Sequence, residues 1–163
     1  MPIEVVKGDI ADQPDLDAVI NAANAQLMPG GGVAGAIHKA AGPELAEACR
    51  EHAPIEPGQA VVTQAFELPN RWIIHVLGPR YHLDEPADEL LAQGYRNAIE
   101  LAEKRDMKSV GSPALSAGAF GYPIDEAARI AVETVRTHLP ESMVFRFVLF
   151  DDSTKEVFDG LVG

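Results

Sequence analysis

The chain has 163 residues, of which 47% are apolar and 23% are charged, and its formal net charge is −12. This length fits one domain, expected to span residues 1–163, and the balance of apolar and charged residues is globular rather than disordered. Such an acidic surface repels a nucleic-acid backbone, so duplex DNA or RNA is not expected as a partner.

The sequence also limits where the protein is expected to act. The first four residues lack the regions of a signal peptide, and no apolar run approaches membrane-spanning length. Cys49 is the only cysteine, so no internal disulfide can form. We expect a monomer in a reducing cytoplasm, without contact to a membrane. The histidines show no metal-ligand spacing, so neither a metal nor a cofactor is predicted.

Apolar runs and helical periodicities alternate along the chain and predict six strands and five helices. In chain order they are strands 3–7 and 18–21, helices 33–41 and 44–51, strands 60–64 and 72–76, helix 89–105, strand 109–113, helix 124–138, strand 144–150 and helix 153–161. Ser153 is predicted to cap the last helix, and Cys49 to be packed or half-exposed. The alternation favours a layered α/β domain, in which ligands bind beyond the carboxyl ends of the strands.

A glycine-rich loop lies between strand 18–21 and helix 33–41. Gly30, Gly31 and Gly32 let a ligand approach the backbone, and the N-terminus of the following helix favours an anion. Residues 30–35 also match G-x-G-x-x-G, but eight residues separate Asn21 from Gly30. The dinucleotide fingerprint begins directly after its strand, so a nicotinamide-dependent oxidoreductase is disfavoured.

A second loop, residues 113–123, also joins a strand to a helix. Gly118 and Gly121 give it backbone freedom, and Phe120 offers an apolar wall. Taken alone, each loop fits a plain turn about as well as a phosphate-binding loop. On the same edge of a sheet, the two loops could hold a pyrophosphate from both sides.

Three polar residues follow predicted strands. The amides of Asn21 and Asn24 suit the recognition of hydroxyl groups, although either could instead cap its own turn, an alternative more credible for Asn21. Asp9 could accept a hydrogen bond from an exocyclic amine or simply cap a turn. His38 and His75 are interpreted as structural, and Ser116 has no base assigned to it.

These motifs together resemble those of the macro domain family, the ADP-ribose-binding module. The resemblance covers nearly the whole chain and rests on segments 8–10, 19–24, 30–37, 40–42, 75–79 and 116–121. It implies a three-layer α/β/α fold with a mixed, roughly six-stranded sheet and ADP-ribose in a cleft at its carboxyl edge.

By position, the resemblance assigns each part of ADP-ribose to residues of this chain. Asp9 and Ile10 would bind adenine, with Phe150 beside it, and Asn24 would bind the distal ribose as the catalytic residue. The remaining ligand-binding residues implied are Ala23, Gly31, Gly32, Val33, Ser116, Ala117, Gly118, Ala119 and Phe120. The partner would be free ADP-ribose or an ADP-ribosylated macromolecule.

One position leaves the activity open. A hydrolase subgroup of the family has Asp where this chain has Ala34, whereas viral macro domains with the same Gly-Gly-Gly-Val-Ala-Gly sequence act without it. The resemblance therefore favours hydrolysis of ADP-ribosyl groups at the distal ribose C1″. The alternatives are a reader without turnover, or a phosphatase or deacetylase of ADP-ribose 1″-phosphate or O-acetyl-ADP-ribose.

Overall fold

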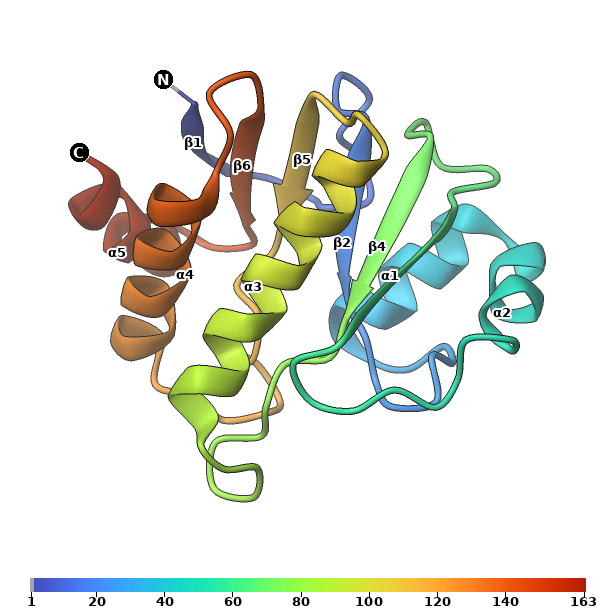
Figure 1. The fold of residues 1–163 in the computed structure, drawn as a ribbon, viewed down its shortest axis with the longest axis horizontal. Coiled ribbons are helices and arrows are strands. Elements are labelled where there is room, and N and C mark those ends of the chain that lie inside the picture. Colours follow the sequence, from blue (N-terminus) through green and yellow to red (C-terminus); the bar gives the residue numbers. More distant parts are fainter. Residues whose placement is uncertain (1) are drawn as a thin grey trace.

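A computed structural model describes residues 2–163 and contains one six-stranded sheet with five helices (Figure 1). The strands are β1 (Ile3–Lys7), β2 (Ala18–Ala22), β3 (Ala60–Gln64), β4 (Trp72–Val76), β5 (Ser109–Ser112) and β6 (Val144–Leu149). The helices are α1 (Gly32–Ala41), α2 (Pro43–Cys49), α3 (Ala87–Lys104), α4 (Ile124–His138) and α5 (Asp152–Val162). Every predicted element is present, with ends shifted by at most two residues.

The sheet is mixed, with the strand order β1-β6-β5-β2-β4-β3. All neighbouring strands pair in parallel except β3, which is antiparallel to β4 at one edge. Helices cover both faces, so the predicted three-layer α/β/α architecture is confirmed (Figure 1). None of the helices in residues 2–163 is long and apolar enough to cross a membrane.

Alternating side chains of the strands build two apolar cores, one on each face of the sheet. In β2, Ile20 packs with the core under α3, α4 and α5, while Val19 packs with the core under α1 and α2. In β6, Phe147 packs with the core under α3, α4 and α5, and Val148 with the core under α1 and α2. Strands buried on both faces explain the continuous apolar runs in the sequence.

Two local expectations are corrected. Asp151, not Ser153, caps α5: its Oδ1 accepts a hydrogen bond from the Thr154 amide at 2.8 Å. Ser153 lies inside the first turn, and its hydroxyl donates to the same carboxylate at 3.1 Å, because an ionised carboxylate is the stronger acceptor. Cys49 is completely buried in the core under α1 and α2, which removes the half-exposed alternative.

The strand order brings four loops to one edge of the sheet. The two glycine-rich loops follow β2 and β5, which are neighbours in the sheet. The loops after β1 and β6 follow another neighbouring pair of parallel strands. Parallel neighbours end on the same side, so this edge collects the loops that the sequence singled out.

Candidate functional site

A cleft of about 820 Å³ lies at this edge, within the size range of small-molecule sites. The structure brings to its walls every binding residue that the family resemblance implied. These are Asp9, Ile10, Ala23, Asn24, Gly31, Gly32, Val33, Ser116, Ala117, Gly118, Ala119, Phe120 and Phe150. The lining thus joins distant parts of the chain, from Gly8 to Thr154, in one cavity.

The first glycine-rich loop presents the start of α1 to the cleft. Gly31 is the N-cap and has no side chain to occupy the N–H groups of the first turn. Gly32 has a φ of 57°, in the left-handed region that glycine adopts without penalty. The first turn of α1 contains no acidic residue. Unoccupied N–H groups and the positive end of the helix dipole make this wall suitable for an anion.

The second loop also lines the cleft and is strained at one residue. Ser116 has a φ of 66°, which is uncommon for a residue with a Cβ. Its carbonyl oxygen accepts a hydrogen bond from the Tyr122 amide at 2.9 Å, which closes the loop. The buried Ser116 hydroxyl has no partner among the described residues, and a Cβ on Gly78 would collide with it. Such backbone strain clusters at functional sites.

Asp9, Ile10 and Phe150 meet at the end of the cleft formed by the loops after β1 and β6. Asp9 Oδ1 accepts a hydrogen bond from the Ala11 amide at 2.9 Å, so the turn-capping alternative also holds. Asp9 Oδ2 has no partner among residues 2–163 and is available to a ligand. Phe150 is 89% exposed at the rim, an arrangement that suits a flat aromatic ring.

Of the two asparagines, Asn24 lines the cleft as predicted, but the expectation that turn capping belongs to Asn21 is wrong. Asn24 lines the cleft, but its amide also caps the loop: Nδ2 donates to the Met28 carbonyl at 2.8 Å and Oδ1 accepts from the Met28 amide at 3.0 Å. Asn21 is buried outside the cleft, with its Nδ2 3.1 Å from Nδ1 of His75 on the neighbouring strand. The turn-capping role thus belongs to Asn24, because Asn21 still lies within β2 and faces the core.

The buried histidines lie outside the cleft wall. His75 Nδ1 faces the Asn21 amide, and its Nε2 lies 2.9 Å from the Thr63 hydroxyl. Because an amide N–H can only donate, Nδ1 accepts and the proton sits on Nε2. Burial lowers the pKa of His75 to about 3, so the ring is neutral at physiological pH. Burial also lowers the pKa of His38.

Charge is scarce in the cleft. Of the described residues that line it, only Asp9 and Asp151 have ionisable side chains. Hydrogen bonding by the Thr154 amide lowers the pKa of Asp151. An anionic ligand would therefore depend on backbone N–H groups, and none of the described lining residues in the two glycine-rich loops offers an ionisable side chain as a base.

Several lining residues were not predicted as binding residues, notably Gly78, Ala36 and Thr154. Gly78 follows β4, which pairs in parallel with β2, so its position at the same edge could have been found from the strand order. Thr154 lines the cleft because α5 starts shortly after the end of β6. Ala36 lies in the second turn of α1 and lines the cleft with its small side chain.

The chain matches the macro domain family model over residues 20–131 and therefore belongs to the macro domain family. A macro domain-containing protein of Chlorobaculum tepidum is 43% identical over 91% of this chain and 86% of its own length. A protein of Cronobacter turicensis named O-acetyl-ADP-ribose deacetylase is 43% identical over 99% of this chain and 96% of its own length.

Solved structures agree with this assignment. The Oceanobacillus iheyensis macrodomain with ADP superposes with a TM-score of 0.94 at 39% identity, over 98% of this chain and 89% of that one. The Trypanosoma brucei macrodomain in complex with ADP-ribose has a TM-score of 0.89 at 32% identity, over 99% of this chain and 69% of that one. The predicted fold and family are both confirmed.

Proposed function

We propose that the chain binds ADP-ribose in the cleft and hydrolyses the acetyl ester of O-acetyl-ADP-ribose. The observation that carries binding is that two backbone-rich walls, residues 31–33 and 116–120, belong to one cleft whose described lining contains no cation. These walls suit a pyrophosphate, because backbone N–H groups bind anions without a cationic side chain. Structures of relatives with ADP and ADP-ribose support the same ligand.

In this proposal the nucleotide lies along the cleft. Asp9 Oδ2 accepts from the adenine amino group, Ile10 packs beside the ring, and Phe150 stacks on it. Asn24 and Phe120 hold the distal ribose. The two hydrogen bonds to Met28 fix the Asn24 amide, yet leave one N–H and one lone pair for ribose hydroxyls. Such fixed orientation lowers the entropy lost on binding.

Relatives named O-acetyl-ADP-ribose deacetylase favour ester hydrolysis over cleavage at the distal ribose C1″, the leading hypothesis from the sequence. Water adds to the acetyl carbonyl, the ester C–O bond breaks, and acetate and ADP-ribose leave. Backbone N–H groups of the cleft suit the oxyanion that forms on the carbonyl. With Ala34 instead of an acid, the water proton passes to a phosphate oxygen of the substrate and from there to the departing ribose oxygen, and positioning supplies most of the acceleration.

Turnover distinguishes this proposal from its alternatives. We expect the protein to release acetate from O-acetyl-ADP-ribose in molar excess over itself, faster than it releases phosphate from ADP-ribose 1″-phosphate or ADP-ribose from an ADP-ribosylated protein. Asn24→Ala should slow acetate release by about 100-fold, because the ribose loses its orientation. Gln26→Ala, an exposed amide of the same loop outside the cleft wall, is the control.

Two results would contradict this part of the account. Binding of ADP-ribose without turnover of any of the three substrates would make the protein a reader. Full acetate release by a folded Asn24→Ala variant would remove Asn24 from the mechanism. Thermal unfolding of each variant shows whether the loop change has affected the fold.

Removal of the Asp9 carboxylate tests the adenine end. Asp9→Ala should weaken ADP-ribose binding by about 1–3 kcal/mol, because a charge-assisted hydrogen bond to the amino group is lost. Asp12→Ala removes the same charge from an exposed position of the same loop. This control variant should bind ADP-ribose with wild-type affinity. Calorimetric titration with ADP-ribose measures both, and equal affinities would overturn the adenine assignment.

A further inference from the structure

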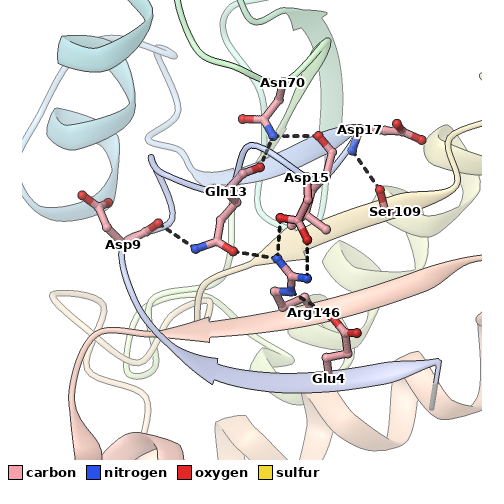
Figure 2. A network of polar contacts seen from close by, with 9 residues as sticks. Glu4, Asp9, Gln13, Asp15, Asp17, Asn70, Ser109 and Arg146 are labelled. Atoms are coloured by element: carbon pink, nitrogen blue, oxygen red, sulfur yellow. Dashed lines mark hydrogen bonds and ion pairs between the residues drawn. The ribbon is translucent and has the colours of Figure 1, made fainter.

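The segment that carries Asp9 into the cleft, residues 8–17, is held by a network of polar contacts (Figure 2). Gln13, only 8% exposed, donates from its Nε2 to the Asp9 carbonyl oxygen at 3.0 Å. The same carbonyl accepts from the Asp12 amide at 2.9 Å. The backbone of Asp9 is thus fixed by two donors, and one of them is a side chain from outside the turn.

Arg146 on β6 anchors this segment to the sheet. Its Nε donates to Glu4 on β1 at 2.8 Å, and its Nη1 donates to Gln13 Oε1 at 2.9 Å. The guanidinium also makes two bonds to the Asp15 carboxylate, at 2.9 and 2.7 Å. Figure 2 shows Gln13 between Asp9 and this guanidinium. One arginine therefore joins two points of the segment to both β1 and β6.

This arrangement determines which way the Gln13 amide points. A guanidinium offers only donors, so the amide must turn its oxygen toward Arg146 and its NH₂ group toward Asp9. Without Arg146, the amide could rotate and leave the Asp9 carbonyl without this donor. The chain from Arg146 through Gln13 to Asp9 consists of three residues, each oriented by the one before it.

A second anchor holds the main chain of the same segment. The buried side chain of Asn70 donates from Nδ2 to the carbonyl oxygens of Gln13 and Leu16, at 2.7 and 2.8 Å. Gln13 is therefore fixed in both its backbone and its side chain. Its amide is a rigid support for Asp9 rather than a mobile surface group.

We infer that Gln13 and Arg146 are positioning residues. They make the cleft selective for adenine over purines that carry a carbonyl where adenine carries its amino group. The inference rests on the proposed function, in which Asp9 meets the adenine amino group. Hypoxanthine carries an oxygen there, and that oxygen repels a carboxylate held in place. A carboxylate free to turn away imposes a smaller penalty, so selectivity depends on how firmly the segment is held.

The test compares the affinities of ADP and inosine 5′-diphosphate by calorimetry. The wild-type protein should bind ADP at least about tenfold more tightly, as expected for one charge-assisted hydrogen bond. Gln13→Glu keeps an acceptor for Arg146 but loses the donor to Asp9, and Gln13→Met loses both without adding charge. Arg146→Lys keeps the charge but loses the planar fork of donors. All three variants should reduce the affinity ratio to about threefold or less, reflecting a partial loss of that bond.

Glu4→Gln is the matched control. It makes the opposite carboxylate-to-amide exchange on the far side of the Arg146 guanidinium and leaves an acceptor oxygen for Nε. The ratio should stay at the wild-type value. If the network had a purely structural role, each variant would bind both nucleotides more weakly to the same extent. The ratio of the two affinities would then stay unchanged in every variant.

The outcomes separate this inference from the proposed function. Folded Gln13→Glu and Gln13→Met proteins that keep the wild-type ratio would overturn the inference alone. Wild-type protein that binds ADP-ribose but treats the two diphosphates equally would also overturn it, with ADP-ribose binding retained. Wild-type protein that binds neither ADP nor ADP-ribose would overturn the proposed function and this inference together.

Discussion

Replacement of Gly35 by alanine should weaken ADP-ribose binding by about 1.5–3 kcal/mol, the range for loss of a hydrogen bond to a charged group. Gly35 lies in α1, where the glycine-rich loop passes so closely that a Cβ would collide with the carbonyl oxygen of Gly30. A main-chain oxygen cannot rotate aside as a flexible side chain can. The loop must therefore move away from the helix, and the N–H groups that we propose bind the pyrophosphate move with it.

Gly160→Ala provides the control for this substitution. Gly160 lies in α5, away from the cleft wall, and an added Cβ there would meet no described heavy atom within 4 Å. We expect unchanged ADP-ribose affinity and a gain in the free energy of unfolding of up to about 1 kcal/mol, from the better helix propensity of alanine. Calorimetry and urea unfolding measure both variants. Wild-type affinity in Gly35→Ala would show that the loop position does not matter for binding.

Acid should destabilise the fold steeply between pH 6.5 and 4.5. The pKa of His75 is about 3 in the folded protein, against 6.5 as the ordinary value. Between these values the unfolded chain binds one more proton than the folded chain, so the free energy of unfolding falls as the pH falls. The expected slope is about 1.4 kcal/mol per pH unit below 6, or about 2.7 kcal/mol in all at pH 4.5.

A variant without the His75 imidazole separates its contribution to the pH dependence of stability from that of other titratable groups. His75→Gln should show a shallower fall in urea unfolding measured at pH 7.5, 6.5, 5.5 and 4.5. His38, whose pKa burial also lowers, contributes in the same direction in both proteins. Carboxylates with lowered pKa values, such as Asp15 and Asp84, lose their contribution only at lower pH. Equal slopes in wild type and variant would show that His75 does not stay neutral.

Much of the fold follows from local patterns in the sequence. The helical spacing of α4 extends over 15 residues, which is long enough for its period to be recognised, whereas the six-residue β6 is assigned to a strand by its short length and its Val and Phe content. The direction of β3 is not contained in such patterns, because an alternation of side chains is the same in either direction; the mixed sheet came from the family resemblance. The helix ends differed where a neighbouring carboxylate, Asp151, competed with Ser153 for the cap.

The candidate site was predictable where it depends on loops that follow strands. Glycines near residue 31 and residue 118 could be placed on one edge from the topology alone. The roles of Asn21 and Asn24 could not, because they depend on contacts that the strand pattern does not contain: Asn21 meets His75 on the neighbouring strand, and Asn24 bonds to Met28. The contact between Gln13 and Arg146 joins positions 133 residues apart. No local pattern indicates such a pair.

A crystal structure of the protein with ADP-ribose tests the account most directly. We predict one molecule in the cleft, with its pyrophosphate between residues 31–33 and 116–120, its adenine between Asp9 and Phe150, and its distal ribose at Asn24. ADP-ribose bound outside the cleft, or a cleft left empty at saturating ADP-ribose, would contradict the account.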